Sequence, residues 1–486
     1  METDKVTEAR TQNEALSKRL FMLKALCGVW IGKTLIFLTR MLGRGGTTLP
    51  GRIALLIAPD ISAYLAGQLT EGSLLITGTN GKTTTASLIK DILNEAGFKC
   101  IHNQAGSNMS WGVASTLVEA ASITAYLRGD VAVLEVDEGS FPEMARRIKP
   151  RGVVATNIFR DQLDRFGEID HIRDSIQLGL EALPPDGFQV INADDPSLAG
   201  LQNSNDSVRW HYGLELDLPP YAFQNTGRDI KTCPRCSTDL AYNNIHFAHL
   251  GHFYCPECKY KRPEPDFQLI DCETNAEGLN QLQIKTPEKV IEVTYPLPGI
   301  YNLYNVLAAV ACAHGLNIRG DIIEKALRKA VPPFGRMELF KTDGKEIIMA
   351  LIKNPVGANE VLRTILGQPG DINILIVIND NIADGRDISW LWDVDFEQLV
   401  TVVNSLSNVI VTGQRSWDMA VRLKYAGLDP DQIQVEEDSA KAVKGAIAKT
   451  KIDHKLFILP TYTAMLEIRR SLNQMGLGKP FWNEEN

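Results

Sequence analysis

Positive charge is scarce in this sequence. Its 486 residues include 50 Lys and Arg against 59 Asp and Glu, which gives a formal net charge of −9 at pH 7. A protein that binds nucleic acid through the phosphates needs a basic surface, so the composition argues for no nucleic-acid partner. It leaves room for an anionic small molecule, because a cleft in an acidic protein can be locally basic.

Long uncharged apolar runs are also missing. The most apolar N-terminal stretch, Phe21–Leu38, contains Lys24 and Lys33, which makes it a poor membrane span. The stretch also starts too far from the N-terminus for a signal peptide, and it has no small-residue cleavage site. We therefore expect a cytoplasmic protein. The stretch fits an amphipathic helix packed on the body. Alternatively it is a surface that rests on the inner face of a membrane, given the basic residues Arg40, Arg44 and Arg52.

Repeats, low-complexity tracts and a disulfide-type cysteine pattern are absent as well. With 44% hydrophobic residues, the chain is globular and long enough for two or three domains. We expect a helical N-terminal segment over 1–65. Strand–helix alternation predicts an α/β central domain over 66–340, interrupted by an insertion over 222–290, and a smaller Rossmann-like domain over 341–486.

Short apolar runs give the positions of the expected strands. In the central domain they are Ser73–Thr77, Val131–Val136, Val153–Thr156 and Phe188–Asn192. In the C-terminal domain they are Ile347–Ile352, Ile374–Ile378, Val409–Thr412 and Leu456–Leu459. Helices are expected over Thr83–Ala96 and Tyr301–Gly315.

A glycine-rich loop, Thr77–Thr85, reads TGTNGKTTT and stands between the first of these strands and a helix. Glycines let backbone N–H groups approach phosphates, the helix N-terminus adds partial positive charge, and a lysine adds a full one. The loop therefore predicts ATP binding, although the common motif has a further glycine where this chain has Ile76. The expected phosphate-binding residues are Gly78, Thr79, Asn80, Gly81, Lys82, Thr83 and Thr84.

Carboxylates follow the next strand. Glu135, Asp137 and Glu138 come at its end, where open α/β sheets bind ligands. Carboxylate oxygens and the Thr83 hydroxyl are the ligands that Mg²⁺ prefers. We expect a magnesium site formed by Thr83, Glu135 and Glu138; read alone, the segment also fits a solvated acidic turn.

More polar residues mark later strand ends and the domain's end: Asn157, Asn192, Asp194, Asn302, Asn305 and Arg336. Singly, each also fits a cap, a turn or a surface charge. In this order, over roughly 70–340, they resemble the Mur ligase family of ATP-dependent amide ligases. The resemblance implies that these residues surround the nucleotide and that a glutamate at the position of Glu135 or Glu138 holds Mg²⁺. It also implies that a carboxylate becomes an acyl phosphate, which an amine then attacks.

The sequence departs from that family in three places. Many members carry an Asp-His pair whose histidine reaches a second metal, whereas this chain has Asp161 and Gln162. Many also carry a carbamylated lysine downstream, but no lysine occurs between Lys149 and Lys231. The second metal site is therefore in doubt. Only about 65 residues precede the loop, too few for the family's complete UDP-binding domain.

Two Cys-x-x-Cys pairs stand in the insertion: Cys233 with Cys236, and Cys255 with Cys258. Four thiolates in two such knuckles suit tetrahedral Zn²⁺ and leave no place for water, so we expect a structural zinc site. Free or redox-active thiols are the alternative. The other cysteines are expected to be buried small hydrophobes: Cys27, Cys100, Cys272 and Cys312.

Acids, an arginine and two tryptophans gather in Asn379–Asp393, directly after a predicted strand. With this segment the resemblance narrows to the Mur ligase-like synthetase subunits of lipid II isoglutaminyl synthase and covers nearly the whole chain. It implies amidation of the D-glutamate α-carboxylate of lipid II, with ammonia from a GatD-like glutaminase partner. It further implies that an aspartate completes the partner's Cys–His pair: Asp380 by its position after the strand, with Asp384 and Asp387 as runners-up.

Two other functions stay open. One is a Mur or folylpolyglutamate type of ligase that adds an amino acid to a carboxylate. The other is a non-catalytic zinc-stabilised scaffold with a relic nucleotide site, against which the intact Lys82, Thr83 and Glu135 argue.

Overall fold

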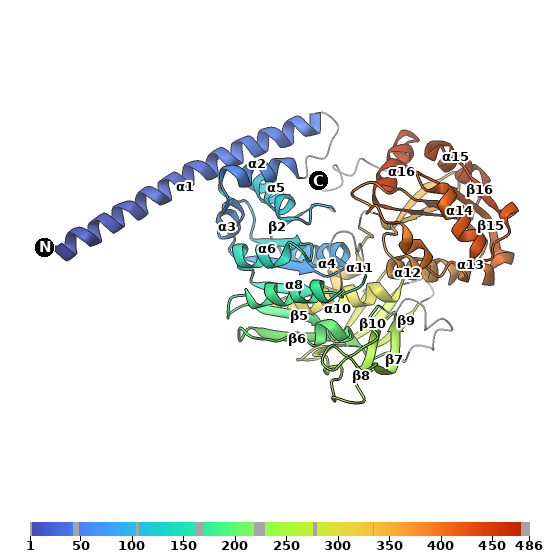
Figure 1. The fold of residues 1–486 in the computed structure, drawn as a ribbon, viewed down its shortest axis with the longest axis horizontal. Helices are drawn as coiled ribbons and strands as arrows, with labels where there is room; N and C mark the ends of the chain where they lie inside the picture. The colour runs from blue at the N-terminus through green and yellow to red at the C-terminus, as the bar shows by residue number, and fades with distance from the viewer. Residues whose placement is uncertain are drawn as a thin grey trace.

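The computed structural model describes residues 2–41, 48–103, 106–160, 169–217, 229–275, 279–333, 335–368 and 370–477, with side chains from residue 19 onward. Two α/β bodies lie side by side, and a long N-terminal helix, α1 (Glu2–Met41), runs across the first of them and projects beyond it (Figure 1).

Nine strands form the sheet of the first body. They are β1 (Ser73–Thr77), β2 (Cys100–His102), β3 (Val131–Glu135), β4 (Gly152–Ala155), β5 (Phe188–Asn192), β6 (Val208–Leu214), β9 (Phe267–Thr274), β10 (Asn280–Lys285) and β11 (Val290–Tyr295). Their order is β11-β10-β9-β6-β5-β4-β1-β3-β2. The strands from β2 to β9 in this order pair in parallel, and β10 and β11 are antiparallel additions at one edge.

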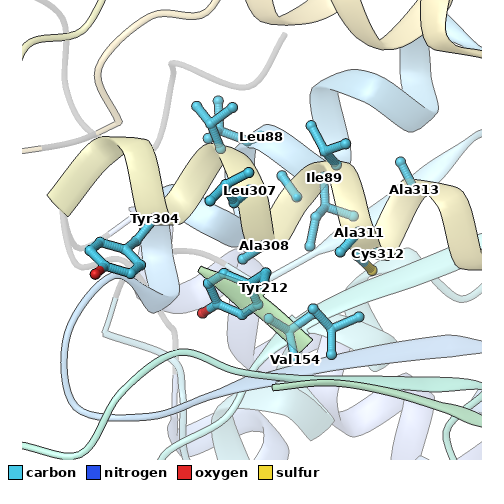
Figure 2. Close-up of a cluster of buried hydrophobic side chains, with 14 of the residues drawn as sticks. Leu88, Ile89, Val154, Tyr212, Tyr304, Leu307, Ala308, Ala311, Cys312 and Ala313 are labelled. Atoms are coloured by element: carbon cyan, nitrogen blue, oxygen red, sulfur yellow. The ribbon is translucent and has the colours of Figure 1, made fainter. Parts of the chain in front are cut away.

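Helices cover both faces of this sheet because each strand is apolar on both sides. Leu74 and Ile76 belong to the core on one face, and Leu75 to the core on the other. The first face carries α4 (Lys82–Glu95), α10 (Ile300–Gly315) and α11 (Gly320–Arg328). Figure 2 shows side chains of α4 and α10 packed with Val154 and Tyr212. The second carries α1, α2 (Leu49–Ile57), α3 (Ile61–Ala66), α5 (Ser110–Ala120), α6 (Phe141–Ile148) and α8 (Ile169–Glu181). The short α9 (Pro196–Ala199) follows β5.

The insertion is shorter than the sequence predicts. Among the described residues, β7 (Ala241–Phe247) and β8 (Leu250–Tyr254) form a separate two-stranded hairpin beside the cysteine pairs. Strands β9 and β10, which fall inside the predicted insertion, instead extend the central sheet. The alternating polar and apolar residues of β10 are typical of a strand with one face on the core.

The second body is built on six strands: β12 (Arg336–Thr342), β13 (Lys345–Ala350), β14 (Ile372–Val377), β15 (Leu406–Thr412), β16 (Ile433–Val435) and β17 (Lys455–Pro460). Their order is β12-β13-β17-β14-β15-β16, and only β12 is antiparallel among these strands. This sheet begins at Arg336, slightly before the predicted boundary at 341. The α/β fold class with a smaller Rossmann-like C-terminal domain is confirmed.

Two layers of helices cover the second sheet. One core packs α12 (Pro355–Leu366) and α14 (Ser416–Tyr425), and the other packs α15 (Ser439–Lys449) and α16 (Tyr462–Gln474). Shorter turns complete the domain: α13 (Gln398–Thr401), η1 (Ser389–Trp392), η2 (Val403–Ser405) and η3 (Pro430–Gln432).

The unpaired cysteines do not all behave as predicted. Cys312 is buried in α10, but Cys100 and Cys272 are only partly buried, and Cys27 is exposed on α1. The prediction for Cys27 is wrong because α1 lies on the surface and turns this residue away from the body.

Candidate active site

The glycine-rich loop joins β1 to α4, and β1 lies between β3 and β4 in the nine-stranded sheet. Gly81 has φ +87°, and a Cβ there would lie 2.4 Å from Oδ1 of Asn305, so only glycine fits this position. The loop is fastened to the end of β4: Asn80 N donates to Asn157 Oδ1 at 2.9 Å, and Thr79 N donates to the Asn157 carbonyl at 2.8 Å. The backbone cradle is thus preformed at the N-terminus of α4.

Lys82 lies buried under this loop. Its Nζ donates to the Gly78 carbonyl and, at 3.2 Å, to the Thr79 carbonyl, and it forms an ion pair with Glu138 at 3.2 Å. Burial raises the pKa of Glu138, and the neighbouring Asp137 raises it further, while Lys82 opposes both effects. A cation bound here would relieve the repulsion between these carboxylates.

Thr83 and Glu135 meet as the sequence predicts for a metal site. The Thr83 hydroxyl donates to Oε2 of Glu135 at 2.8 Å, because Glu135 ends β3 directly beside Ile76 of β1. Glu135 and Glu138 are both buried. A hydroxyl and two carboxylates at a phosphate loop form a donor set that fits Mg²⁺.

Three of the predicted asparagines lie around the loop: Asn302 and Asn305 hydrogen-bond to each other, and Asn192 lies apart from them. Asn305 Oδ1 accepts from the Thr85 hydroxyl at 3.2 Å, and its amide donates to Asn302 at 3.3 Å. Asn192 instead donates to the Thr156 carbonyl at 2.8 Å and is fully buried, which makes it a brace behind the loop.

A pocket opens beside the loop, and both domains line it. Eight of the predicted residues contribute to its wall: Asn80, Gly81, Thr83, Thr84, Asn157, Asn302, Asn305 and Arg336. The central domain adds the rings of Phe247, Tyr301 and Tyr304, and the C-terminal domain adds Met337 and Val361. An apolar, ring-lined pocket next to a triphosphate cradle suits a purine base.

Sequence reasoning missed two polar residues at this junction. Asn354 caps α12 through Gly357 N at 2.8 Å, and its amide donates to Asn80 Oδ1 at 3.0 Å, which ties the C-terminal domain to the loop. The Asn-Pro pair that opens α12 is the sequence signal for this cap. Glu360 lines the pocket from α12, and burial raises its pKa to about 7 while Arg363 opposes the shift.

Asp194 is not among the described residues that line the pocket, although the sequence predicts it beside the nucleotide. Its fully buried carboxylate accepts from Arg262 Nε at 2.5 Å, from the Tyr304 hydroxyl at 2.6 Å and from Leu214 N at 3.1 Å, with His246 Nδ1 at 3.2 Å. Burial alone would raise the pKa of Asp194, but Arg262 and His246 outweigh it and lower the pKa. Asp194 is therefore ionised at neutral pH, and its role here is to hold the surrounding side chains in place.

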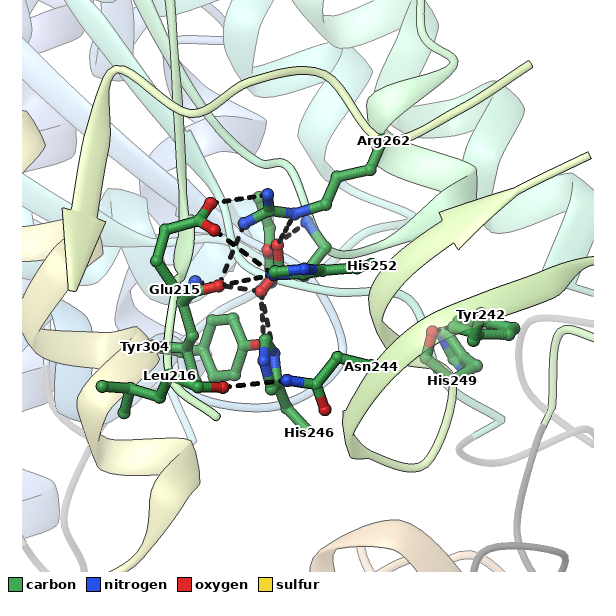
Figure 3. A network of polar contacts seen from close by, with 12 residues as sticks. Glu215, Leu216, Tyr242, Asn244, His246, His249, His252, Arg262 and Tyr304 are labelled. Carbon is green, nitrogen blue, oxygen red and sulfur yellow. Dashed lines mark hydrogen bonds and ion pairs between the residues drawn. The ribbon is translucent and has the colours of Figure 1, made fainter. Parts of the chain in front are cut away.

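The same network joins the hairpin to the pocket wall (Figure 3). His246 lies on β7, Arg262 follows the second cysteine pair, and Tyr304 lies on α10. Phe247, next to His246, packs its ring against Tyr304 at a centroid distance of 5.6 Å, and both rings line the pocket. The hairpin between the cysteine pairs thus supplies part of the nucleotide pocket.

The four cysteines converge on one point. Their Sγ atoms all lie within 4.8 Å of one another, with Cys233–Cys258 at 3.5 Å and Cys236–Cys255 at 3.4 Å. Thiolates around a tetrahedral zinc ion stand ~3.8 Å apart, given Zn–S bonds of about 2.3 Å. Backbone N–H groups of Arg235 and Cys258 also point at the sulfurs of Cys233 and Cys255, as in metal knuckles. The cluster fits a structural metal site.

The acidic segment after β14 holds its three aspartates differently. Asp380 forms an ion pair with Arg415, whose Nη2 (2.6 Å) and Nε (2.9 Å) both donate to Oδ2 of Asp380, at the edge of a surface hollow that includes Asn381 and Arg386. Asp384 is buried and accepts from Thr463 N at 2.6 Å; burial raises its pKa although these hydrogen bonds oppose the shift. The exposed Asp387 accepts from Ser389 N, which lowers its pKa. Asp380 is thus the aspartate held in a fixed orientation at the surface.

One sequence feature cannot be placed. Asp161 and Gln162, which stand where many Mur ligases carry their Asp-His pair, lie outside the described residues.

Comparison with known proteins agrees with this geometry. Residues 76–228 match the Mur ligase middle domain, and residues 351–465 match the MurT ligase C-terminal domain. The chain is 35% identical over 439 residues to the Lipid II isoglutaminyl synthase (glutamine-hydrolyzing) subunit MurT of Staphylococcus aureus strain COL, covering 90% of this chain and 95% of that protein. The same subunit of Streptococcus pneumoniae strain R6 is 35% identical, covering 93% and 97%. Among solved structures, a pseudomurein peptide ligase type C from Methanothermus fervidus superposes with a TM-score of 0.61 at 25% identity, covering 85% of this chain and 80% of the other.

Proposed function

Because the chain belongs to the MurT family, the ligase subunits of lipid II isoglutaminyl synthase, we propose that it amidates the D-glutamate α-carboxylate of lipid II to D-isoglutamine at the expense of ATP. The observation that carries the proposal is a complete triphosphate loop, with Lys82 and the Thr83–Glu135 pair in place, in a chain 35% identical to MurT subunits over 90% of its length.

The reaction has two steps. A carboxylate oxygen of lipid II attacks the γ-phosphorus of ATP, the bond to the β–γ bridging oxygen breaks, and ADP leaves. Ammonia then attacks the carbonyl carbon of the acyl phosphate, inorganic phosphate leaves, and a proton is lost from nitrogen. Activation is needed because a free carboxylate has no good leaving group for an amine to displace.

The residues of the loop position ATP and neutralise its charge. Backbone N–H groups at the start of α4 and the Lys82 ammonium face the triphosphate, and the purine lies in the pocket between Phe247, Tyr304 and the α12 wall. Thr83, Glu135 and Glu138 would hold Mg²⁺, which supplies charge neutralisation at the transferring phosphoryl group when it is bound. Cys233, Cys236, Cys255 and Cys258 would hold Zn²⁺ away from the reaction.

Ammonia comes from a GatD-like glutaminase that forms a heterodimer with this chain. Asp380 is the aspartate offered to the partner's Cys–His pair, because Arg415 fixes its carboxylate at the surface while Asp384 is turned inward. A carboxylate held in this way can orient a histidine and stabilise its charged form. The exposed Ile382, which lines the same surface hollow as Asp380, suits a protein contact.

The test is amidation with purified components. The chain, ATP, Mg²⁺ and a lipid II analogue should release ADP and give the amide with ammonia, or with glutamine once the glutaminase is added. Lys82→Ala should abolish ADP release in both assays while leaving the circular dichroism spectrum unchanged. Asp380→Asn should abolish only the glutamine-dependent reaction. Product formation with an amino acid in place of ammonia would point to the amino-acid ligase instead.

The substrate also fixes a location. Lipid II carries a polyprenyl chain, so the reaction takes place in the cytoplasm at the inner face of the membrane. By length and composition, one helix among the described residues, α1 over Arg19–Met41, could cross a membrane.

A further inference from the structure

Helix α1 has two opposite apolar faces, and only one of them is covered. Ala25, Val29 and Ile36 are buried against α2 and α5. Gly32 lets the helices approach closely, because a Cβ there would lie 2.7 Å from a methyl group of Val118. This close packing holds α1 flat along the body of the central domain.

Large apolar side chains make up most of the uncovered face, with the smaller Cys27 and Thr34 between them. Their exposed fractions run from 47% at Leu38 to 70% at Met41. At 3.6 residues per turn their positions fall on about one third of the helix circumference, opposite the packed face. We call them the apolar stripe: Leu20, Leu23, Trp30, Phe37, Leu38 and Met41.

The stripe continues onto the segment after α5. Trp30 Nε1 donates to the Ile123 carbonyl at 2.6 Å, which fixes this segment beside the stripe. Ile123 and Tyr126 are themselves 71% and 63% exposed. The apolar surface is therefore wider than a single helix face, and continuous patches of this kind mark a protein or membrane contact.

The charged side chains of α1 beside the stripe are all basic, and the neighbouring α5 adds one carboxylate, that of Glu119. Residues 19–41 contain no aspartate or glutamate. Arg19 and Lys24 are exposed at its borders. On the side facing the body, Lys33 donates to the Glu119 carbonyl at 2.7 Å, and Arg40 pairs with the Glu119 carboxylate at 2.6 Å. An apolar strip edged by cations complements an anionic lipid surface.

We propose that the apolar stripe docks this protein onto an anionic lipid bilayer, with α1 lying in the plane of the membrane surface. The stripe would enter the headgroup boundary while the packed face stays on α2 and α5. This inference extends the proposed function and rests on it, because a lipid-anchored substrate is reached from the membrane surface.

Two other occupants fit less well. A membrane-spanning helix would have to leave α2 and α5 and expose the apolar side chains that Val29 and Ile36 now cover. A second copy of the chain could pair through the spacing of Leu20, Leu23, Trp30 and Phe37, but it would bring cations together without an acidic residue in 19–41 to pair with them.

The test uses the full chain and vesicles of phosphatidylglycerol with phosphatidylcholine. The wild-type chain should co-sediment with them, less so at high salt and less so with pure phosphatidylcholine. Leu23→Glu/Phe37→Glu should reduce binding at least about tenfold. The control Leu178→Glu/Ile452→Glu, at exposed positions on α8 and before β17, should bind like the wild type. Wild-type chain that stays in the supernatant, or equal binding by the stripe variant, would overturn the proposal.

Two further measurements separate the explanations. Sedimentation velocity without vesicles should show a single copy; a dimer that Leu23→Glu/Phe37→Glu dissociates would assign the stripe to a second copy and overturn membrane docking. Amidation of a water-soluble analogue without the lipid chain should be equal in the wild type and the stripe variant. Failure of both proteins in that assay would reject the proposed function and leave the vesicle result standing.

Discussion

Tyr304 donates its hydroxyl to Asp194 at 2.6 Å while its ring forms part of the nucleotide pocket. Burial raises the pKa of Tyr304 well above its usual value, so the hydroxyl stays a donor throughout the physiological range. Because Arg262 also holds Asp194, the pocket wall depends on a charged residue that follows the second cysteine pair. The hydrogen bond thus couples the cysteine module to the nucleotide.

Removing that hydroxyl should cost stability more than turnover. Tyr304→Phe keeps the ring but removes one hydrogen bond to a buried carboxylate, so we expect the free energy of unfolding to fall by about 1–2 kcal/mol. Arg262→Met should cost about 3–5 kcal/mol, since it leaves Asp194 as a poorly compensated buried charge. Denaturant unfolding measures both. Tyr425→Phe, at an exposed ring, is the control and should have no effect.

The Thr83 hydroxyl should be required for magnesium-dependent turnover. Thr83→Val removes the oxygen that faces Glu135 and should lower kcat for ADP release by about 100-fold or more. Thr83→Ser keeps the oxygen and should stay within a few-fold of the wild type. Equal losses in the two variants would mean that the methyl group, and not the hydroxyl, matters at this position.

Gly81 should not tolerate a side chain, because a Cβ there would collide with Asn305 in addition to adopting an unfavourable positive φ. Gly81→Ala and Gly97→Ala both place alanine at positive φ, but only the Cβ at 81 collides with Asn305, whereas nothing lies within 4 Å of position 97. Gly97→Ala should lose about 1 kcal/mol of stability, and Gly81→Ala should lose more because of the added collision. Only Gly81→Ala should raise the KM for ATP by tenfold or more, and isothermal titration with an ATP analogue provides a direct comparison.

The cysteine cluster should bind about one zinc ion per chain. Cys233→Ser should lower the thermal midpoint, because binding free energy at such a site is also folding free energy. It should also raise the KM for ATP through Phe247, which the hairpin places in the pocket wall. Cys272→Ser, outside the cluster, should change neither value. Full zinc content in Cys233→Ser would contradict the four-thiolate assignment.

Glu360 should make stability fall as the pH rises. Its pKa of about 7 in the folded protein lies above the ordinary value of 4.5, so the folded state holds more protons between these values and loses stability as pH increases through this window. Glu360→Gln should therefore gain relative to the wild type, by up to about 3 kcal/mol above pH 7, and gain little below pH 4.5. Thermal unfolding across pH 4–8 tests this, with the exposed Glu264→Gln as control.

Contacts between residues at the ends of neighbouring strands can be predicted from the sequence. Thr83 and Glu135 meet because β1 and β3 are adjacent, and short continuous apolar runs locate both strands. Phe247 and Glu360 escaped prediction because a hairpin and a second domain bring them to the loop, and no local pattern encodes that approach. The sequence also could not predict that the Asp194 side chain points away from the pocket. Its orientation depends on Arg262 and His246, which the fold places beside it.

The hydrogen bond between the buried Asn354 and Asn80, which lines the pocket, crosses from the C-terminal domain to the central domain. A nucleotide that contacts both domains in this pocket should therefore stabilise the contact between the two domains for as long as it is bound. By mass action, a ligand at 100 times its Kd adds about 2.7 kcal/mol to the state that binds it. Saturating ATP should then shield the crossing at 331–333 from proteases, so that the protein's lifetime rises and falls with the energy charge of the cell.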